Sequence, residues 1–241
     1  MDTKLEANDS VALIRNALGN AEFFADWRPE MLARLVQGAK LRRYERGEQV
    51  LTGAGSARQA LLVVSGFLEV SQTTSNGRRF VLGIIGPGAT AGLVHLCGDV
   101  PVEYGHVARE RAVVVHFFCD NALAALNSEP TFWNGVAERL LRRHAELVDA
   151  VLGQVVLGPA DQRIAATLQR LAILFGVQGG EGVRLRLRLS QDDLADMLCV
   201  SRQTVNKELR RLEENGVLVC TYNTVTIVDP KGLANIAARR A

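Results

Sequence analysis

The stretch from Leu189 to Gly216, LSQDDLADMLCVSRQTVNKELRRLEENG, constrains the fold more than any other part of the sequence. Ser190 and Asp193 have the spacing of a capping box, so we expect a helix to begin there. Ser201 can cap a second helix, which we expect to stop at Gly216. Two short helices separated by a tight turn are typical of a helix-turn-helix.

The second predicted helix, residues 201–215, has two chemically different sides. At about 100° per residue, Val205, Leu209 and Leu212 share one side. A solvated helix surface usually mixes both signs of charge, whereas the opposite side here holds donors and amides without a carboxylate. Such side chains can reach base edges in a major groove. The residues on this polar side are Arg202, Gln203, Asn206, Lys207 and Arg210.

The segments on either side of these helices complete a winged arrangement. VLVCTYNTVTIV predicts two brief strands around Tyr222-Asn223, which would form the wing. Before the helices, the alternation in VRLRLRLS predicts a strand with an apolar face and an arginine face. Ser201 and Thr204 are candidates for phosphate contacts. The arginines of the strand either contact phosphates as well or are solvated: Arg184, Arg186 and Arg188.

The first half of the chain predicts a different architecture. Residues 10–40 carry apolar residues at helical spacing, and residues 41–118 hold short β-like runs punctuated by glycine, with a turn expected at Asn76-Gly77. Several short strands of this kind suggest an antiparallel sandwich or roll. The fold class is therefore α+β, with a β-roll followed by a long helix and a winged helix-turn-helix.

The long helix is expected to start near Pro130 and to run to Leu157. It carries two apolar stripes, so we expect it to cover the β-roll on one side and to meet a second copy of itself on the other. Burial inside one large monomer core is the alternative. The first stripe holds Trp133, Ala137, Leu140, His144, Leu147 and Val151, and the second holds Leu141, Val148, Leu152 and Val155.

Leu157-Gly158-Pro159 breaks the helical pattern and is the predicted hinge. We therefore divide the chain into N-terminal helices and a β-roll in residues 1–128, a dimerisation helix in residues 129–157 and a winged helix-turn-helix domain in residues 158–241.

Composition excludes several classes of protein. The net charge of the 241 residues is only +2, which argues against general polyanion binding. The start of the chain lacks the regions of a signal peptide, and no apolar run approaches the roughly 20 residues of a membrane span, so a cytoplasmic location without membrane contact is expected. The four cysteines show neither zinc nor iron–sulfur spacing. They are expected to be reduced and mostly buried.

The segment Leu189–Gly216 resembles the DNA-binding segment of the cyclic-AMP receptor protein/Fnr (Crp/Fnr) family of bacterial regulators. RGEQV followed by LLVVSGFLEV is similar to the β-roll of that family. The resemblance implies a homodimer that inserts two recognition helices into a two-fold symmetric site on double-stranded DNA, with RNA polymerase as a further partner.

The resemblance also suggests which residues read the bases. In the receptor-protein branch an Arg-Glu pair opens the recognition helix, and an arginine follows four residues after the glutamate. The corresponding residues here are Arg202, Gln203 and Lys207. Arg202 is expected to pair with guanine. Gln203 pairs best with adenine, whereas glutamate accepts from cytosine, so a different half-site is expected.

The phosphate cassette of the family departs from the cyclic-AMP pattern in this chain. The glycine of the cassette is matched by Gly92, but the position of its ribose-binding glutamate reads Leu93. The arginine and serine positions read Glu103 and Tyr104. A carboxylate facing a phosphate in a poorly solvated pocket repels it. These four residues mark the candidate effector pocket, and conventional cyclic-AMP binding is not expected.

Several alternatives for regulation remain open. In the first, a shifted alignment brings Arg109 or Arg111 to the phosphate position, and the effector is a different anion or a cyclic dinucleotide. In the second, haem is held near His95, His106 or Cys97. In the third, the protein has no effector. The cysteine group of the cluster-bearing branch is missing, so no iron–sulfur cluster is expected. Cys199, in the turn of the helix-turn-helix, is either a redox-sensitive thiol or a packing residue. A C-terminal domain that binds protein rather than DNA is the main competing function. No catalytic constellation is visible, so we do not expect an enzyme.

Overall fold

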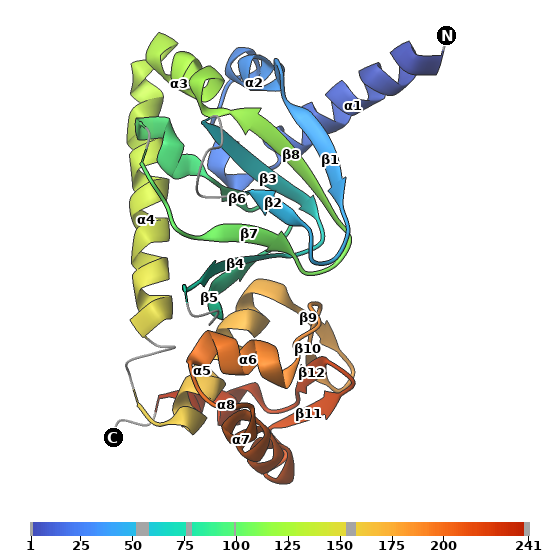
Figure 1. Cartoon of the computed structure of the whole chain (residues 1–241), viewed down its shortest axis with the longest axis vertical. Coiled ribbons are helices and arrows are strands. Elements are labelled where there is room, and N and C mark those ends of the chain that lie inside the picture. Colours follow the sequence, from blue (N-terminus) through green and yellow to red (C-terminus); the bar gives the residue numbers. More distant parts are fainter. Residues whose placement is uncertain (1, 52–57, 76–78, 99, 153–157, 239–241) are drawn as a thin grey trace. The chain divides into compact units, whose positions relative to one another are not determined.

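The computed structural model describes residues 2–51, 58–75, 79–98, 100–152 and 158–238 (Figure 1). Two compact units make up the chain. The N-terminal unit holds residues 1–73 and 83–142, and the C-terminal unit holds residues 74–82 and 143–241. No described helix is both long enough and apolar enough to cross a membrane.

The predicted N-terminal helices are present. They are α1 (Asp2–Gly19), the 3-10 helix η1 (Glu22–Phe24) and α2 (Pro29–Val36). Proline opens α2, where its missing N–H costs nothing. The ring of Phe24 packs edge-on against Trp27 at 5.0 Å and against Phe117 at 5.6 Å, so the helices are anchored to the sheet behind them.

The β region forms two antiparallel four-stranded sheets, as predicted for a roll (Figure 1). The turn predicted at Asn76-Gly77 lies outside the described residues. In the first sheet the order is β1 (Lys40–Tyr44), β8 (Ala112–Phe118), β3 (Gln59–Ser65) and β6 (Thr90–Ala91). In the second the order is β2 (Gln49–Leu51), β7 (Gly105–Ala108), β4 (Leu68–Thr73) and β5 (Arg79–Ile85).

The side chains of the first sheet belong to two separate hydrophobic cores, because successive residues of a strand point to opposite faces of the sheet. Leu61, Val63 and Val114 lie in the cluster inside the roll, with Leu68 of the second sheet. The neighbours of these residues, such as Leu62, Val115 and Phe117, lie in the cluster that the helices cover. The alternation of the strands therefore sorts the side chains between roll and helices.

A helix that was not predicted follows the last strand. It is α3 (Cys119–Ser128), and it is connected through the 3-10 helix η3 (Pro130–Phe132) to α4 (Trp133–Val151). The predicted long helix therefore exists, but its α-helical part begins three residues after Pro130. A short 3-10 helix, η2 (Leu93–Cys97), lies between β6 and β7.

The C-terminal unit has the predicted winged helix-turn-helix elements. They are α5 (Ala160–Phe175), α6 (Gln191–Leu198), α7 (Arg202–Glu214) and a terminal helix, α8 (Pro230–Ala237). The sheet has the order β11 (Leu218–Thr221), β12 (Thr224–Ile227), β10 (Gly182–Leu185) and β9 (Gly176–Gly179). β9 was not predicted, because its glycines lack a strand pattern.

Candidate nucleic-acid interface

The start of α6 is fixed by a complete capping box. The Ser190 hydroxyl accepts from the Asp193 backbone N–H at 3.1 Å, and the Asp193 carboxylate accepts from the Ser190 N–H at 2.8 Å. These bonds satisfy backbone donors that a helix start leaves unpaired. Leu194 and Leu198 then point into the core, which fixes the rotation of α6.

The turn between the two helices depends on one unusual backbone conformation. Cys199 ends α6 with φ at +51°, in the left-handed region that a side chain disfavours. Two residues later the Ser201 hydroxyl accepts from the Thr204 N–H at 3.0 Å and caps α7. At the other end of α7, Gly216 has φ at +67°, which confirms the predicted αL stop.

α7 has the two faces that the sequence predicts. Val205, Leu209 and Leu212 are at most 4% exposed and hold the helix against the unit. The opposite side is open to solvent along the first three turns, and its cations and amide can all reach outward: Arg202, Gln203, Lys207 and Arg210. The helix therefore presents long donors on an anchored backbone.

Two polar contacts connect this face to α6. Arg202 Nη1 lies 3.5 Å from Asp192 Oδ2, and both side chains are about two-thirds exposed. An exposed pair of this kind contributes little stability, so Arg202 is available to another partner. Asn206 is half-buried, and its Oδ1 accepts from Gln191 Nε2 at 3.2 Å. Asn206 is thus less free to reach bases than the sequence suggested.

The predicted phosphate-contacting residues lie together at the start of α7. The Ser201 and Thr204 hydroxyls are 2.8 Å apart and share one hydrogen bond. Ser201 is exposed and Thr204 is half-buried. Because the positive end of the helix dipole lies here, these hydroxyls and the free N–H groups beside them suit a phosphate oxygen.

The wing forms as predicted. β11 and β12 pair in register from Leu218 with Ile227 to Thr221 with Thr224. Asn223 has φ at +55°, a conformation that asparagine tolerates in tight turns. Tyr222 at the tip is 88% exposed, so an aromatic side chain is presented to whatever the wing approaches.

The arginine face before α6 is also confirmed. Arg184, Arg186 and Arg188 are exposed, while Leu185 and Leu187 between them are at most 2% exposed. Only the first of these arginines lies within β10, since the strand ends at Leu185 and extended chain carries the rest.

The long helix α4 leaves an apolar stripe uncovered. Its first turns are in the N-terminal core, where Val136 is fully buried and Trp133 and Leu140 pack beside it. Leu141, Val148 and Leu152 are 40–69% exposed. At helical spacing these three lie on one side, about 100° away from the packed residues. His144 is exposed, and the predicted Val155 lies outside the described residues, as does Leu157 of the predicted hinge.

The candidate effector pocket is assembled only in part. Gly92 has φ at +76°, and a Cβ there would lie 2.7 Å from the Gln59 carbonyl oxygen, so only glycine suits this position. Leu93 is 5% exposed and lies in the core between sheet and helices. Its side chain is part of the hydrophobic core, and its place in an effector pocket stays a prediction.

The other two predicted pocket residues, Glu103 and Tyr104, lie just before β7. Glu103 is exposed, and its Oε2 accepts from Gln72 Nε2 at 2.8 Å. Tyr104 packs edge-on against His106 with ring centroids 6.0 Å apart. The residues at the phosphate positions of the family are thus a carboxylate and a ring. They do not suit a cyclic phosphate held in the usual way.

The thiols and imidazoles give no metal site in the part of the chain that the structure describes, since no three candidate ligands come together there. The expectation of mostly buried thiols is half right. Cys119 is buried, which raises its pKa to about 12, and burial raises the pKa of half-buried Cys220 to about 11. Cys97 and Cys199 are exposed.

Sequence reasoning missed the supporting residues of the interface. Gln191 and Asp192 were interpreted only as parts of a helix start, although both contact α7. Arg163 donates to the Leu198 carbonyl at 2.8 Å and thereby ties α5 to the end of α6. Their only sequence signal is polarity at a helix start, which many unrelated helices share.

Comparison with known proteins matches both halves of the chain. Residues 162–236 match the family described as Crp-like helix-turn-helix domain, and residues 41–129 match the family described as cyclic nucleotide-binding domain. Together the two matches cover more than half of the sequence.

Two relatives span almost the whole chain. The CRP-like cAMP-activated global transcriptional regulator of Mycobacterium tuberculosis is 25% identical over 223 residues, which is 91% of this chain and 98% of that protein. The nitrogen fixation regulation protein FixK of Bradyrhizobium diazoefficiens is 26% identical over 247 residues, covering 91% of this chain and 95% of the relative. Both are named as regulators rather than enzymes.

Solved structures show the same fold. A CRP-family transcriptional regulator from Thermus thermophilus matches with a TM-score of 0.67 and 24% sequence identity, over 83% of this chain and 97% of that one. A CooA mutant from Carboxydothermus hydrogenoformans matches with a TM-score of 0.70 and 20% identity, over 91% and 94% of the two chains.

Proposed function

The chain belongs to the Crp/Fnr family of transcription regulators, and we propose that it acts as a homodimer whose two α7 helices enter successive major grooves of a symmetric DNA site. The exposed donor face of α7 carries this proposal. It lies opposite a buried apolar face, so the helix is held by its own unit while its donors reach outward.

Each exposed residue of α7 has a chemical role in this proposal. Arg202 supplies a planar fork for the O6 and N7 atoms of guanine, and Gln203 pairs with adenine. Lys207 lacks the fork and acts as a point charge. Ser201 and Thr204 hold a phosphate at the helix start, which fixes the register of α7. Asn206 acts mainly through Gln191, as a positioning residue.

The stripe of Leu141, Val148 and Leu152 supports dimerisation. Three large apolar side chains on one side of a helix, each at least 40% exposed, would be unusual for a monomer. Burial against the same stripe of a second copy gives a two-fold interface. In this proposal residues 1–128 form the sensor domain, residues 129–157 the dimerisation helix and residues 158–241 the DNA-binding domain.

The effector of the regulator is not a conventionally bound cyclic AMP in this proposal. Relatives are named as cAMP-activated, yet the carboxylate of Glu103 and the ring of Tyr104 occupy the phosphate positions here. Another ligand or no ligand controls the protein. Contact with RNA polymerase and a place in the cytoplasm, where bacterial promoters lie, are parts of the same proposal.

Salt-dependent binding to duplex DNA tests the function. Arg202→Ala and Lys207→Ala should each weaken binding, and the Lys207 variant should lower the salt slope by about one released counterion. Lys231→Ala on α8 is the matched control for a lost cation outside the interface. A protein that binds no duplex at low salt would point to a protein partner for the C-terminal unit.

A further inference from the structure

The edge strand β1 carries cations that have no counter-ion. Lys40, Arg42 and Arg43 lie on this strand, and within the described ranges none of them forms an ion pair. Arg111, an exposed arginine elsewhere in this unit, is by contrast paired with Glu45 at 3.2 Å. The charge on β1 is thus available for an external anion.

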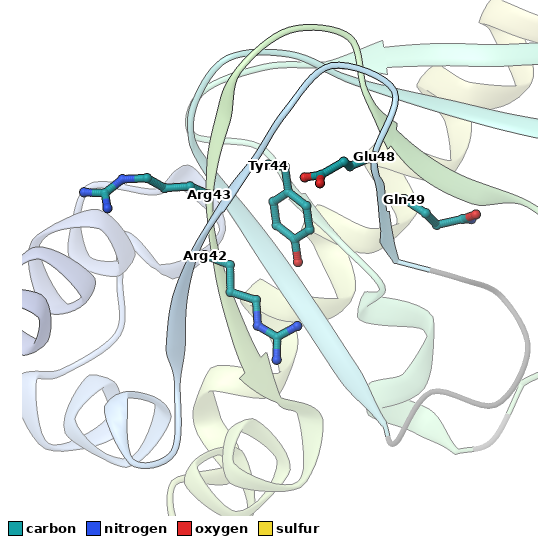
Figure 2. A pocket seen from close by; sticks show the side chains of 5 residues that line it. All are labelled: Arg42, Arg43, Tyr44, Glu48 and Gln49. Carbon is teal, nitrogen blue, oxygen red and sulfur yellow. The ribbon is translucent and has the colours of Figure 1, made fainter.

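Strand alternation separates these cations between two faces. Lys40 and Arg42 share the face of Tyr44, while Arg43 lies on the other face. A surface hollow of about 460 Å³ is lined by Arg42, Tyr44, Glu48 and Gln49, and by Arg43 as well. In Figure 2 the side chains of Arg42, Tyr44 and Glu48 lie near one another, whereas Arg43 and Gln49 extend away from them in opposite directions.

Arg42 also borders a small hollow of about 40 Å³ with Lys40, Gln59 and His116. His116 is 7% exposed, and its Nε2 lies 2.8 Å from the Tyr44 hydroxyl. The register that pairs Lys40 with His116 sets these groups side by side. Tyr44 is therefore held in place by a buried partner.

The hollow is chemically divided. Arg42 and Arg43 supply the cations of the larger hollow, and Arg42 shares the smaller hollow with Lys40. A guanidinium and an ammonium suit the oxygens of a phosphate dianion. The larger hollow also holds the Gln49 amide and the Glu48 carboxylate, which accepts from the Glu45 N–H at 2.8 Å and has lone pairs left for hydroxyl donors. None of Gly92, Leu93, Glu103 and Tyr104 lines either hollow.

We propose that a small hydroxylated phosphate ester binds at these two hollows. Its phosphate lies on Arg42, which lines both, and on Lys40, which lines the smaller one, and its hydroxyl-bearing part lies against Tyr44, Glu48 and Gln49. The site is separate from both the recognition helix and the cassette positions. It gives the N-terminal unit a ligand that does not depend on the cyclic-nucleotide pattern.

Nuclear magnetic resonance of the full chain tests the site, because only four histidines contribute ring signals. Titration with ribose 5-phosphate should shift the His116 ring signals saturably. Inorganic phosphate, which lacks the hydroxyl-bearing part, should bind more weakly. Arg42→Gln should lower the affinity for ribose 5-phosphate by about tenfold or more, since it removes a charge-assisted contact.

Arg15→Gln is the control, because it removes the same charge from an exposed position of the N-terminal unit that lines neither hollow. It should leave the affinity within about twofold of the original protein. Equal loss in both variants would mean a general charge effect and would overturn the site. The absence of a saturable His116 shift in the millimolar range, or equal affinity for phosphate and its ester, would overturn it as well. Lys40→Gln provides a second test if Arg42→Gln fails to fold.

Discussion

Gln191 at the first position of α6 donates a hydrogen bond to Asn206 of α7, with Nε2 and Oδ1 3.2 Å apart. This bond joins the two helices of the helix-turn-helix beside the residues that we propose to contact DNA. Together with the buried side chains of Val205 and Leu209, it holds α7 in a fixed orientation relative to α6.

The bond predicts coupling between its two residues. Gln191→Ala and Asn206→Ala should each destabilise the protein, and the double variant should lose less than the sum. We expect a coupling free energy of about 1 kcal/mol, the usual net value of a hydrogen bond. Urea denaturation of the four proteins measures it. Strict additivity would show that the contact does not stabilise the pair.

The exposed stripe on α4 predicts the assembly state. Leu141→Asp together with Val148→Asp places charges at the proposed interface, so the dimer should dissociate. Sedimentation should then give a monomer mass, and DNA affinity should fall by roughly 100-fold because the two binding units are no longer linked. Glu146→Lys, an exposed charge change on a different side of α4, should leave the mass unchanged. Monomers in the unaltered protein would contradict this account.

The left-handed conformation of Cys199 predicts a stabilising substitution. Glycine adopts φ near +51° without a Cβ penalty, so Cys199→Gly should raise the free energy of unfolding by about 0.5–1 kcal/mol. Cys199→Val should lower it, because branched side chains resist this conformation. Unaltered DNA binding by Cys199→Gly after oxidation, with loss in the original protein, would identify the exposed thiol as redox-sensitive.

His116 predicts a pH dependence of stability. Burial, and then the charge of Arg42, lower its pKa from 6.5 to about 4. Lys40, Tyr44 and Gln59 are the other polar groups near it. The unfolded chain therefore binds more protons between these two pH values, and stability falls as pH falls through this window, by up to about 3 kcal/mol.

His116→Gln should remove that part of the slope, whereas His144→Gln, at an exposed position, should keep it. Thermal unfolding at a series of pH values measures the difference. A slope that is the same in both variants would show that His116 titrates normally in the folded protein.

Local signals made the C-terminal unit predictable. A capping serine, an αL stop at Gly216 and the strict alternation around Leu185 and Leu187 each depend on a few neighbouring residues. They can therefore be recognised without knowledge of the rest of the fold. The two faces of α7 follow from the same periodicity.

Contacts between distant segments could not be predicted in this way. Leu93 was assigned to a pocket by its position in a cassette, but tertiary packing turns it into the hydrophobic core. Tyr44 and His116 meet only through the register of β1 and β8, across 72 residues of sequence. α3 was missed because no turn signal separates Cys119 from the preceding strand.

Enrichment of random duplex DNA by the purified protein, without added effector, tests the central claim most directly. The account predicts recovery of a two-fold symmetric motif with adenine at the position read by Gln203, and Gln203→Glu should shift that position toward cytosine. A motif without symmetry, or one that Gln203→Glu leaves unchanged, would contradict the proposed recognition by paired α7 helices.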